Sequence, residues 1–443
     1  MPRGIEAQEL IDHIIDHCHD DRRTLCALSL VSRRWLPSAR HHLFERVSVV
    51  VDLESAPGCR RTARSLASFA TLVTSGSERS PFPVRMAVRS LRVQHGELAD
   101  MAKVLGELPR LRKLQLCHLY VKSLGSWSDR TPLPTFDLEE LEFTGCTADT
   151  AGDLFEFVQF YNSIRTLTIH DLVLRNKTSA LRSSTYGTNA ASKPCVKVFS
   201  LSYPGYYSGS FEEGATVTSL LGLLASQVKD RDLESLQFTV HISPTNPTLN
   251  PAFSTLVQAV SGNLRSLKLD VEALSRFRHD WTPVPFTKDT LDLSACKALR
   301  DVTLSLRLNL AYDRLFWADP FDILTPLTPS SISLTVNVIL SHTIRSCPKA
   351  IMGSALKNVR WRKLSRMTKA WRCDWKRLEI RFGGCPIWEF SDAEREEVRA
   401  ALEEHGITRY DFQCSCCLCI SEKTYTGSPP YPSSMRAFLL SIP

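Results

Sequence analysis

The sequence predicts an α/β fold in which three short N-terminal helices precede a long, irregular array of strand–helix repeats. Two observations support this prediction. A short apolar phrase recurs along most of the chain, and residues at helical spacing fill several of the intervals between its copies. The beginning of the chain carries apolar residues at the spacing of short helices. We therefore predict a helical domain over residues 1–46, a repeat array over 47–382, and a C-terminal helix with a Cys- and Pro-rich tail over 383–443.

Three helices account for residues 5–46. The first carries Leu10, Ile11, Ile14 and Ile15 at helical spacing, and Asp20-Asp21 supplies a break after it. Thr24 is a candidate cap for the second helix, and Pro37 fits the start of the third better than its interior. A unit this small holds little core, so it is expected to gain stability from a partner or from the adjoining array.

The repeated phrase is an apolar residue, two polar residues, an apolar residue, one polar residue and an apolar residue. Its last two positions alternate as on a strand buried on one face, and the stretches 98–105, 217–228 and 253–260 show helical spacing. One such unit cannot bury its apolar face alone, so the units are expected to stack. The strand anchors are Leu91/Val93, Leu114/Leu116, Leu141/Phe143, Leu167/Ile169, Phe199/Leu201, Leu236/Phe238, Leu267/Leu269, Val302/Leu304, Ile332/Leu334 and Leu378/Ile380.

The phrase and its period resemble those of leucine-rich repeat proteins over roughly residues 85–382. The residue between the two anchors is polar in every copy, which predicts a row along one exposed sheet face. The resemblance makes that face a candidate surface for a target protein, although a merely solvated face would be polar too. The predicted target-binding residues are Arg92, Gln115, Glu142, Thr168, Ser200, Gln237, Lys268 and Thr303, and Ser333 and Glu379 continue the row.

Two N-terminal stretches carry a recognisable pattern. They are Gln8-Glu9-Leu10-Ile11-Asp12-His13-Ile14-Ile15 and Leu25-Cys26-Ala27-Leu28-Ser29-Leu30-Val31-Ser32-Arg33-Arg34-Trp35. Together they resemble the F-box, in the F-box-like form common in fungi. The family usually has Leu-Pro before its Glu-Leu pair, where this sequence has Glu6-Ala7. The family joins an N-terminal F-box to a recognition domain, often of leucine-rich repeats, and the resemblance finds both parts here in that order.

This resemblance implies a protein that docks on the Skp-type adaptor of a cullin-RING ubiquitin ligase and presents a captured target. A cytoplasmic or nuclear location is expected, because no apolar run approaches the roughly 18 residues of a membrane span and no signal peptide is recognisable. The alternative is a scaffold without a ligase role, in which the helices only cap the first repeat. The residues predicted to contact the adaptor, or to form the core behind that contact, are Leu10, Ile11, Ile14, Leu28, Val31 and Trp35.

A second alternative concerns the basic segment 345–381. The chain has a net charge of +7, and this segment alone holds twelve Lys and Arg against Asp374 and Glu379. Interleaved Trp361, Trp371 and Trp375 would suit nucleic acid, since cations contact phosphates and aromatic rings stack on bases. An amphipathic helix with a solvated basic face is the simpler interpretation.

No catalytic chemistry is predicted. Phosphate-binding, dinucleotide-binding, nucleophile-elbow and zinc-protease motifs are all missing from the sequence, so we expect neither an enzyme nor a cofactor. His13 and His17 are close enough on one helix for a metal, but exposed polar residues are the simpler interpretation. Four thiols so close in sequence strain to form a tetrahedral zinc site, so we expect no metal at Cys414, Cys416, Cys417 and Cys419. The alternative is that Cys385 or a histidine supplies a ligand from a distance.

Overall fold

The computed structural model describes two compact units. The first comprises Met1–Asp270, Val284–Val302 and Asp322–Pro329, and the second comprises Val271–Pro283, Thr303–Phe321 and Ser330–Pro443. Both contain strands and helices, and a three-helix segment begins the first, so the predicted α/β class is confirmed. The described residues are 7–50, 64–75, 83–97, 101–121, 136–175, 195–202, 211–227, 233–239, 249–273, 292–309, 320–324, 327, 333–341, 361–370, 378–384, 396, 399–400, 402–404 and 410–412.

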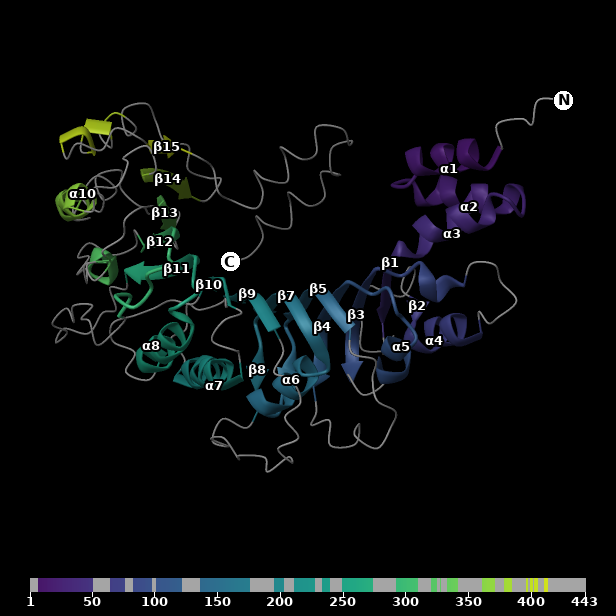
Figure 1. The fold of residues 1–443 in the computed structure, drawn as a ribbon, viewed down its shortest axis with the longest axis horizontal. Coiled ribbons are helices and arrows are strands. Elements are labelled where there is room, and N and C mark those ends of the chain that lie inside the picture. Colours follow the sequence, from purple (N-terminus) through teal and green to yellow (C-terminus); the bar gives the residue numbers. More distant parts are fainter. Residues whose placement is uncertain are drawn as a thin grey trace, which may run out of the picture. The chain divides into compact units, whose positions relative to one another are not determined.

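The three-helix segment consists of α1 (Ala7–His17), α2 (Arg22–Val31) and α3 (Leu36–Glu45) (Figure 1). Pro37 lies in the first turn of α3, as predicted. Thr24 is not the cap of α2, however. Asp21 occupies that position and accepts the backbone N–H groups of Arg23 and Thr24 at 3.0 and 3.2 Å. A carboxylate two and three residues before free N–H groups is well placed to cap them. From the sequence, Asp21 was predicted only to break the chain after the first helix.

Parallel strands form the sheet of the first unit. Neighbouring strands follow the order β2-β1-β3-β4-β5-β7-β9-β10-β11, with β6 pairing β4 and β8. Their bounds are β1 (Arg46–Val50), β2 (Arg64–Ser65), β3 (Ser90–Glu97), β4 (Lys113–Val121), β5 (Phe136–Thr144), β6 (Thr147–Ala148), β7 (Tyr161–His170), β8 (Val173–Leu174), β9 (Cys195–Ser202), β10 (Ser235–Thr239) and β11 (Ser266–Ala273).

The predicted anchors align across this sheet. Leu91 pairs with Leu114, and the same column continues strand by strand to Leu267. Each anchor on these strands is almost completely buried. The apolar phrase therefore sets the register as well as the buried face, because a one-residue slip would move every anchor to the other side.

Helices lie along one side of these strands (Figure 1). Phe143 of β5 meets Phe157 of α6 with ring centroids 6.0 Å apart, and Phe238 of β10 meets Phe253 of α8 at 4.6 Å. The core therefore lies between the anchors and the helices. The elements are α4 (Leu66–Ser75), the 3-10 turn η1 (Val84–Met86), α5 (Ala102–Gly106), α6 (Ala151–Val158), α7 (Phe211–Gln227) and α8 (Leu249–Val260). The helices predicted in 98–105, 217–228 and 253–260 correspond to α5, α7 and α8.

Strand β1 is a copy of the phrase that the sequence analysis missed. Phe44, Val47 and Val49 have the required spacing, and Val47 pairs with Leu91 in the anchor column. The copy was overlooked because the next one begins more than forty residues later. The sheet thus starts directly where α3 ends.

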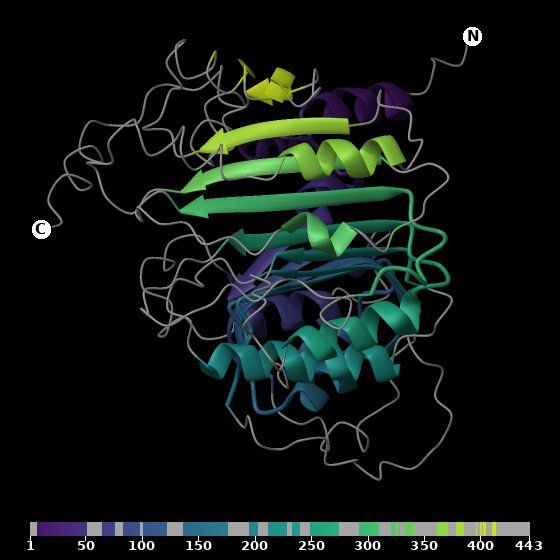
Figure 2. The ribbon, with the colours of Figure 1, turned by 90° about the vertical axis from the view of Figure 1, so that its left-hand side faces the viewer.

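The second unit contains the later strands β12 (Asp301–Asn309), β13 (Ser333–Ser341), β14 (Leu378–Gly384) and β15 (Tyr410–Phe412), and the first two residues of β12 belong to the first unit. The strands β12, β13 and β14 run in one direction (Figure 2), and β14 pairs in parallel with β13 and β15. Leu334 pairs with Leu378 and Val336 with Ile380. The anchors of β13 are therefore Leu334 and Val336 rather than Ile332, which lies outside the described residues, and Thr335 replaces Ser333 in register with Glu379.

Helix α10 (Trp361–Ala370) falls within the basic segment and is amphipathic, as predicted. Trp361 is 2% exposed and packs near Phe321, with ring centroids 6.2 Å apart, whereas Arg362 and Arg366 are exposed. Phe321 belongs to the 3-10 turn η4 (Pro320–Leu324). Trp361 therefore cannot stack on a nucleic-acid base, and Trp371 and Trp375 lie outside the described residues. None of the helices in the described part of the chain is long and apolar enough to cross a membrane.

Candidate functional site

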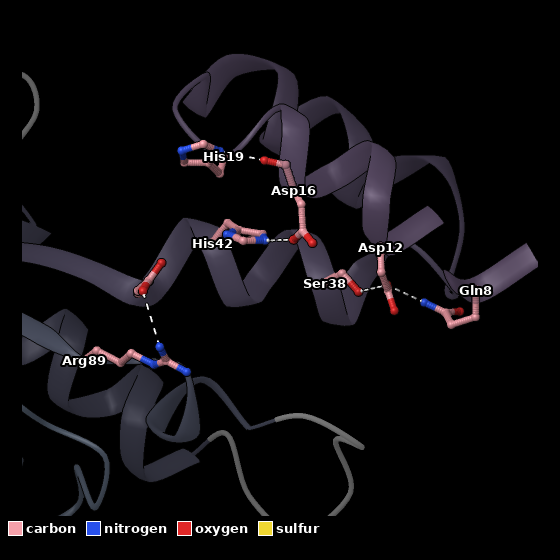
Figure 3. Close-up of polar contacts among 8 residues, drawn as sticks. Gln8, Asp12, Asp16, His19, Ser38, His42 and Arg89 are labelled. Carbon is pink, nitrogen blue, oxygen red and sulfur yellow. Dashed lines mark hydrogen bonds and ion pairs between the residues drawn. The ribbon is translucent and has the colours of Figure 1, made fainter. Parts of the chain in front are cut away.

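Helix α1 presents three distinct faces. Ile11 and Ile15 point into the small core, where they meet Leu25 and Ala39. A polar face is tied to α3: the Asp12 carboxylate accepts a hydrogen bond from Ser38, and Asp16 Oδ1 lies 2.8 Å from His42 Nε2 (Figure 3). The third face follows one stripe, where Leu10, His13, Ile14 and His17 are all exposed to solvent.

Helix α2 also has both buried and exposed apolar residues. Leu25 is buried at 1% exposure, whereas Leu30 and Val31, at the end of the helix, are 85% and 62% exposed. Gln8 Nε2 donates to the carbonyl oxygen of Arg34 at 3.3 Å, which joins the first turn of α1 to the turn between α2 and α3. Both helices thus carry exposed apolar side chains. We call Leu10, Ile14, Leu30 and Val31 the apolar face.

The structure separates the six residues predicted for adaptor contact or core. Ile11 is buried, and Leu28 and Trp35 are partly buried against the core. Leu10 and Ile14 are 61% and 40% exposed and, with Val31, belong to the apolar face. Trp35 and Leu28 pack against the same core, whereas Ile14 is not part of that cluster. Leu30 is the most exposed large apolar residue of those described, and the sequence analysis did not select it.

The three-helix segment meets the sheet through α3, not through the apolar face. Helix α3 runs directly into β1, and the carbonyl oxygen of Glu45 accepts the Arg89 backbone N–H at 3.0 Å. The Arg89 guanidinium also lies 3.9 Å from the Glu45 carboxylate (Figure 3). Helix α3 is therefore the part of the segment that can shield the first strand from solvent, and the apolar face stays exposed.

The predicted polar row is aligned in the first unit. Arg92 pairs with Gln115, Glu142 follows, and the row reaches Lys268 through Thr168, Ser200 and Gln237. Arg92 is exposed and the others are half-buried. Gln115 Nε2 donates to Glu142 Oε2 at 2.9 Å, so part of the row is engaged within the face itself. Thr303 is half-buried between Val302 and Leu304 on β12.

A second row, which the sequence analysis missed, runs along the strand starts. Two positions before the first anchor, each of eight copies has a charged residue, and six of the eight are cations. The Arg112 and Glu139 side chains pair at 2.7 Å, and Glu234 pairs with Arg265 at 3.8 Å. Exposed pairs of this kind contribute about 0.2–1 kcal/mol each, so they align neighbouring strands more than they stabilise the fold. The residues are Arg89, Arg112, Glu139, Arg165, Lys197, Glu234, Arg265 and Arg300.

Among the described residues, no group of three or more His, Cys, Asp and Glu side chains is arranged to hold a metal ion. Residues Cys385, Cys414, Cys416, Cys417 and Cys419 lie outside this part of the chain. Cys146 is buried after β5, where its thiol donates to the Leu116 carbonyl oxygen at 3.2 Å. Burial raises the pKa of this thiol to about 11, which fits a structural residue and not a nucleophile.

Comparison with models of known protein families gives no match, and comparison with curated proteins gives none either.

Proposed function

We propose that this protein is the substrate-recognition subunit of a Skp-cullin-F-box type ubiquitin ligase. In this proposal the three-helix segment is an F-box-like domain that docks on the Skp-type adaptor. The strand–helix region forms an irregular leucine-rich-repeat-like solenoid and binds a target protein, and the chain performs no bond chemistry itself. The complex would act in the cytoplasm or nucleus, away from membranes.

The observation that carries the proposal is the apolar face. Five large apolar side chains are exposed in the described structure, and four of them belong to this short segment. The segment has a core of its own, and none of these four residues is among the side chains that form it or pack against it. A contiguous exposed apolar patch is typical of an interaction site, and the concentration of these residues on two adjoining short helices favours such a patch here. Their positions also fall within the two stretches that resemble the F-box.

The polar row and the charged row are the candidate target surface. Each row has one side chain per strand, so hydrogen-bond donors and acceptors recur at regular spacing across the sheet. The excess of cations at the strand starts favours a target with acidic side chains.

The experiment is co-purification of the intact chain with a Skp-type adaptor and its cullin. The double variant Leu10→Ser/Ile14→Ser should lose the adaptor. Val173→Ser is the matched control, because Val173 is 56% exposed but lies on β8, and it should retain the adaptor. Failure of the intact chain to bind, while an established F-box protein binds in parallel, would contradict the proposal.

A scaffold without a ligase role is the second candidate. It is favoured by the direct continuation of α3 into β1 and by the Glu45–Arg89 contacts, which suit a structural cap. Under this alternative, loss of the apolar face leaves the lifetime of a bound target unchanged. Accumulation of the target on depletion of the chain, rescued by the wild type but not by Leu10→Ser/Ile14→Ser, would exclude it.

A further inference from the structure

The exposed stripe of α1 contains two histidines as well as two apolar residues. The Nε2 atoms of His13 and His17 lie 3.3 Å apart, and the two ring planes are nearly perpendicular, with centroids 4.6 Å apart. Both side chains are exposed. The neighbouring His19 is engaged differently: its ring contacts the Asp16 carbonyl oxygen at 2.6 Å and the Asp20 carboxylate at 3.1 Å.

The distance between the two Nε2 atoms fits a shared metal ion. Zinc binds imidazole nitrogen at about 2.0–2.1 Å in tetrahedral geometry, which places two such nitrogens about 3.3–3.4 Å apart. The two Nε2 atoms already lie at this spacing, one helical turn apart. A hydrogen bond between the rings would need one ring to donate and the other to accept, whereas an ion can use the lone pairs of both.

We propose that His13 and His17 form a binding site for one divalent transition-metal ion, Zn²⁺ in the first place, with water in the remaining coordination positions. Neutral imidazole is a good ligand for Zn²⁺, Cu²⁺ and Ni²⁺, whereas Mg²⁺ and Ca²⁺ prefer oxygen ligands. The site is therefore expected to bind Zn²⁺, Cu²⁺ or Ni²⁺ in preference to Mg²⁺ or Ca²⁺. The sequence alone placed these residues on one helix, and the distance between their Nε2 atoms is what assigns them to a metal.

The position of this pair has a consequence for partner binding, which rests on the proposed function. Leu10, His13, Ile14 and His17 share one stripe of α1. A hydrated dication on that stripe opposes its burial, since removing an ion from water is costly unless it is paired. Zinc and the adaptor are therefore expected to compete for this face.

The test of the metal site is histidine footprinting of the intact chain. Diethyl pyrocarbonate acylates accessible imidazole nitrogens, and mass spectrometry of the peptides reports His13 and His17 separately. ZnCl₂ should protect both residues while MgCl₂ protects neither. In His17→Gln the zinc-dependent protection of His13 should be lost, and in the control His19→Gln it should persist. Equal labelling with and without zinc, or protection of His13 that survives His17→Gln, would overturn the site.

The competition is measured separately, as the affinity of the intact chain for the adaptor with and without ZnCl₂. Zinc should weaken binding of the wild type, and this dependence on zinc should be absent in His17→Gln. Adaptor binding that zinc does not change would overturn the competition. Absence of adaptor binding under every condition would refute the proposed function, while the footprinting result would still decide the metal site.

Discussion

Two leucines of α2 provide a matched test of the division between core and apolar face. Leu25 and Leu30 are the same residue on the same helix, yet Leu25 is buried in the core and Leu30 is almost fully exposed. Replacement by Ala removes three carbons in both cases. At about 0.8 kcal/mol per buried methylene, Leu25→Ala costs about 2.4 kcal/mol in transfer free energy, and the cavity raises the cost to about 3–5 kcal/mol. Leu30→Ala should change stability by less than about 0.5 kcal/mol.

The assay is hydrogen exchange of the three-helix peptides in the intact chain, because exchange reports local opening. Leu25→Ala should accelerate exchange there by at least about 140-fold, since each 1.4 kcal/mol corresponds to a factor of ten and the expected cost is at least about 3 kcal/mol. Leu30→Ala should leave exchange unchanged but weaken adaptor binding by more than about fivefold, the loss of about 1 kcal/mol typical of an important interface residue. Equal exchange in the two variants, or adaptor binding unaffected by Leu30→Ala, would refute the assignment of the two faces.

The other predictions concern local structure. Thr150→Ala removes the side-chain cap of α6, so it should destabilise that helix by about 1 kcal/mol; unchanged exchange in α6 would count against the cap. Cys146 should resist maleimide at pH 8 in the folded chain, because its pKa of about 11 leaves few thiolates, while the exposed Cys26 reacts; equal labelling would contradict this. Hydrogen bonds from the Thr24 side chain and backbone hold the pKa of Asp21 below its usual 3.8. The cap should therefore stabilise α2 above pH 3.8 and lose its effect as the pH falls through the lowered pKa. An NMR titration of Asp21 that Thr24→Val leaves unchanged would contradict that cause.

Most of the strands could be predicted from the sequence because the anchors carry a period of two residues within each copy. Leu114 and Leu116 are buried on the same face, as their spacing requires. Strand β1 has the same phrase, but the long interval before the next copy hid it. The register of β13 was misread by two residues because Ile332, Leu334 and Val336 alternate continuously, so spacing alone does not show which pair faces the core.

Which residues of the three-helix segment are buried was harder to predict from the sequence than the presence of its helices. Apolar residues at helical spacing predict that α1 and α2 exist, but the six selected residues do not all lie on one face. Ile14 and Ile15 are adjacent isoleucines, and only the packing of α1 against α2 and α3 determines that Ile15 is buried while Ile14 is exposed. The charged row was missed because it precedes the anchors, and its members differ in sign. Their common feature is visible only when the strands are aligned.

The central claim is that the apolar face of α1 and α2 is the adaptor-docking surface. The most direct measurement is hydrogen exchange of the intact chain with and without a purified Skp-type adaptor. The claim predicts slower exchange in α1 and α2 on addition of the adaptor, no change in strands β3–β11, and loss of the effect in Leu10→Ser/Ile14→Ser. An adaptor complex that protects only the strands, or no protection anywhere at saturating adaptor, would contradict it.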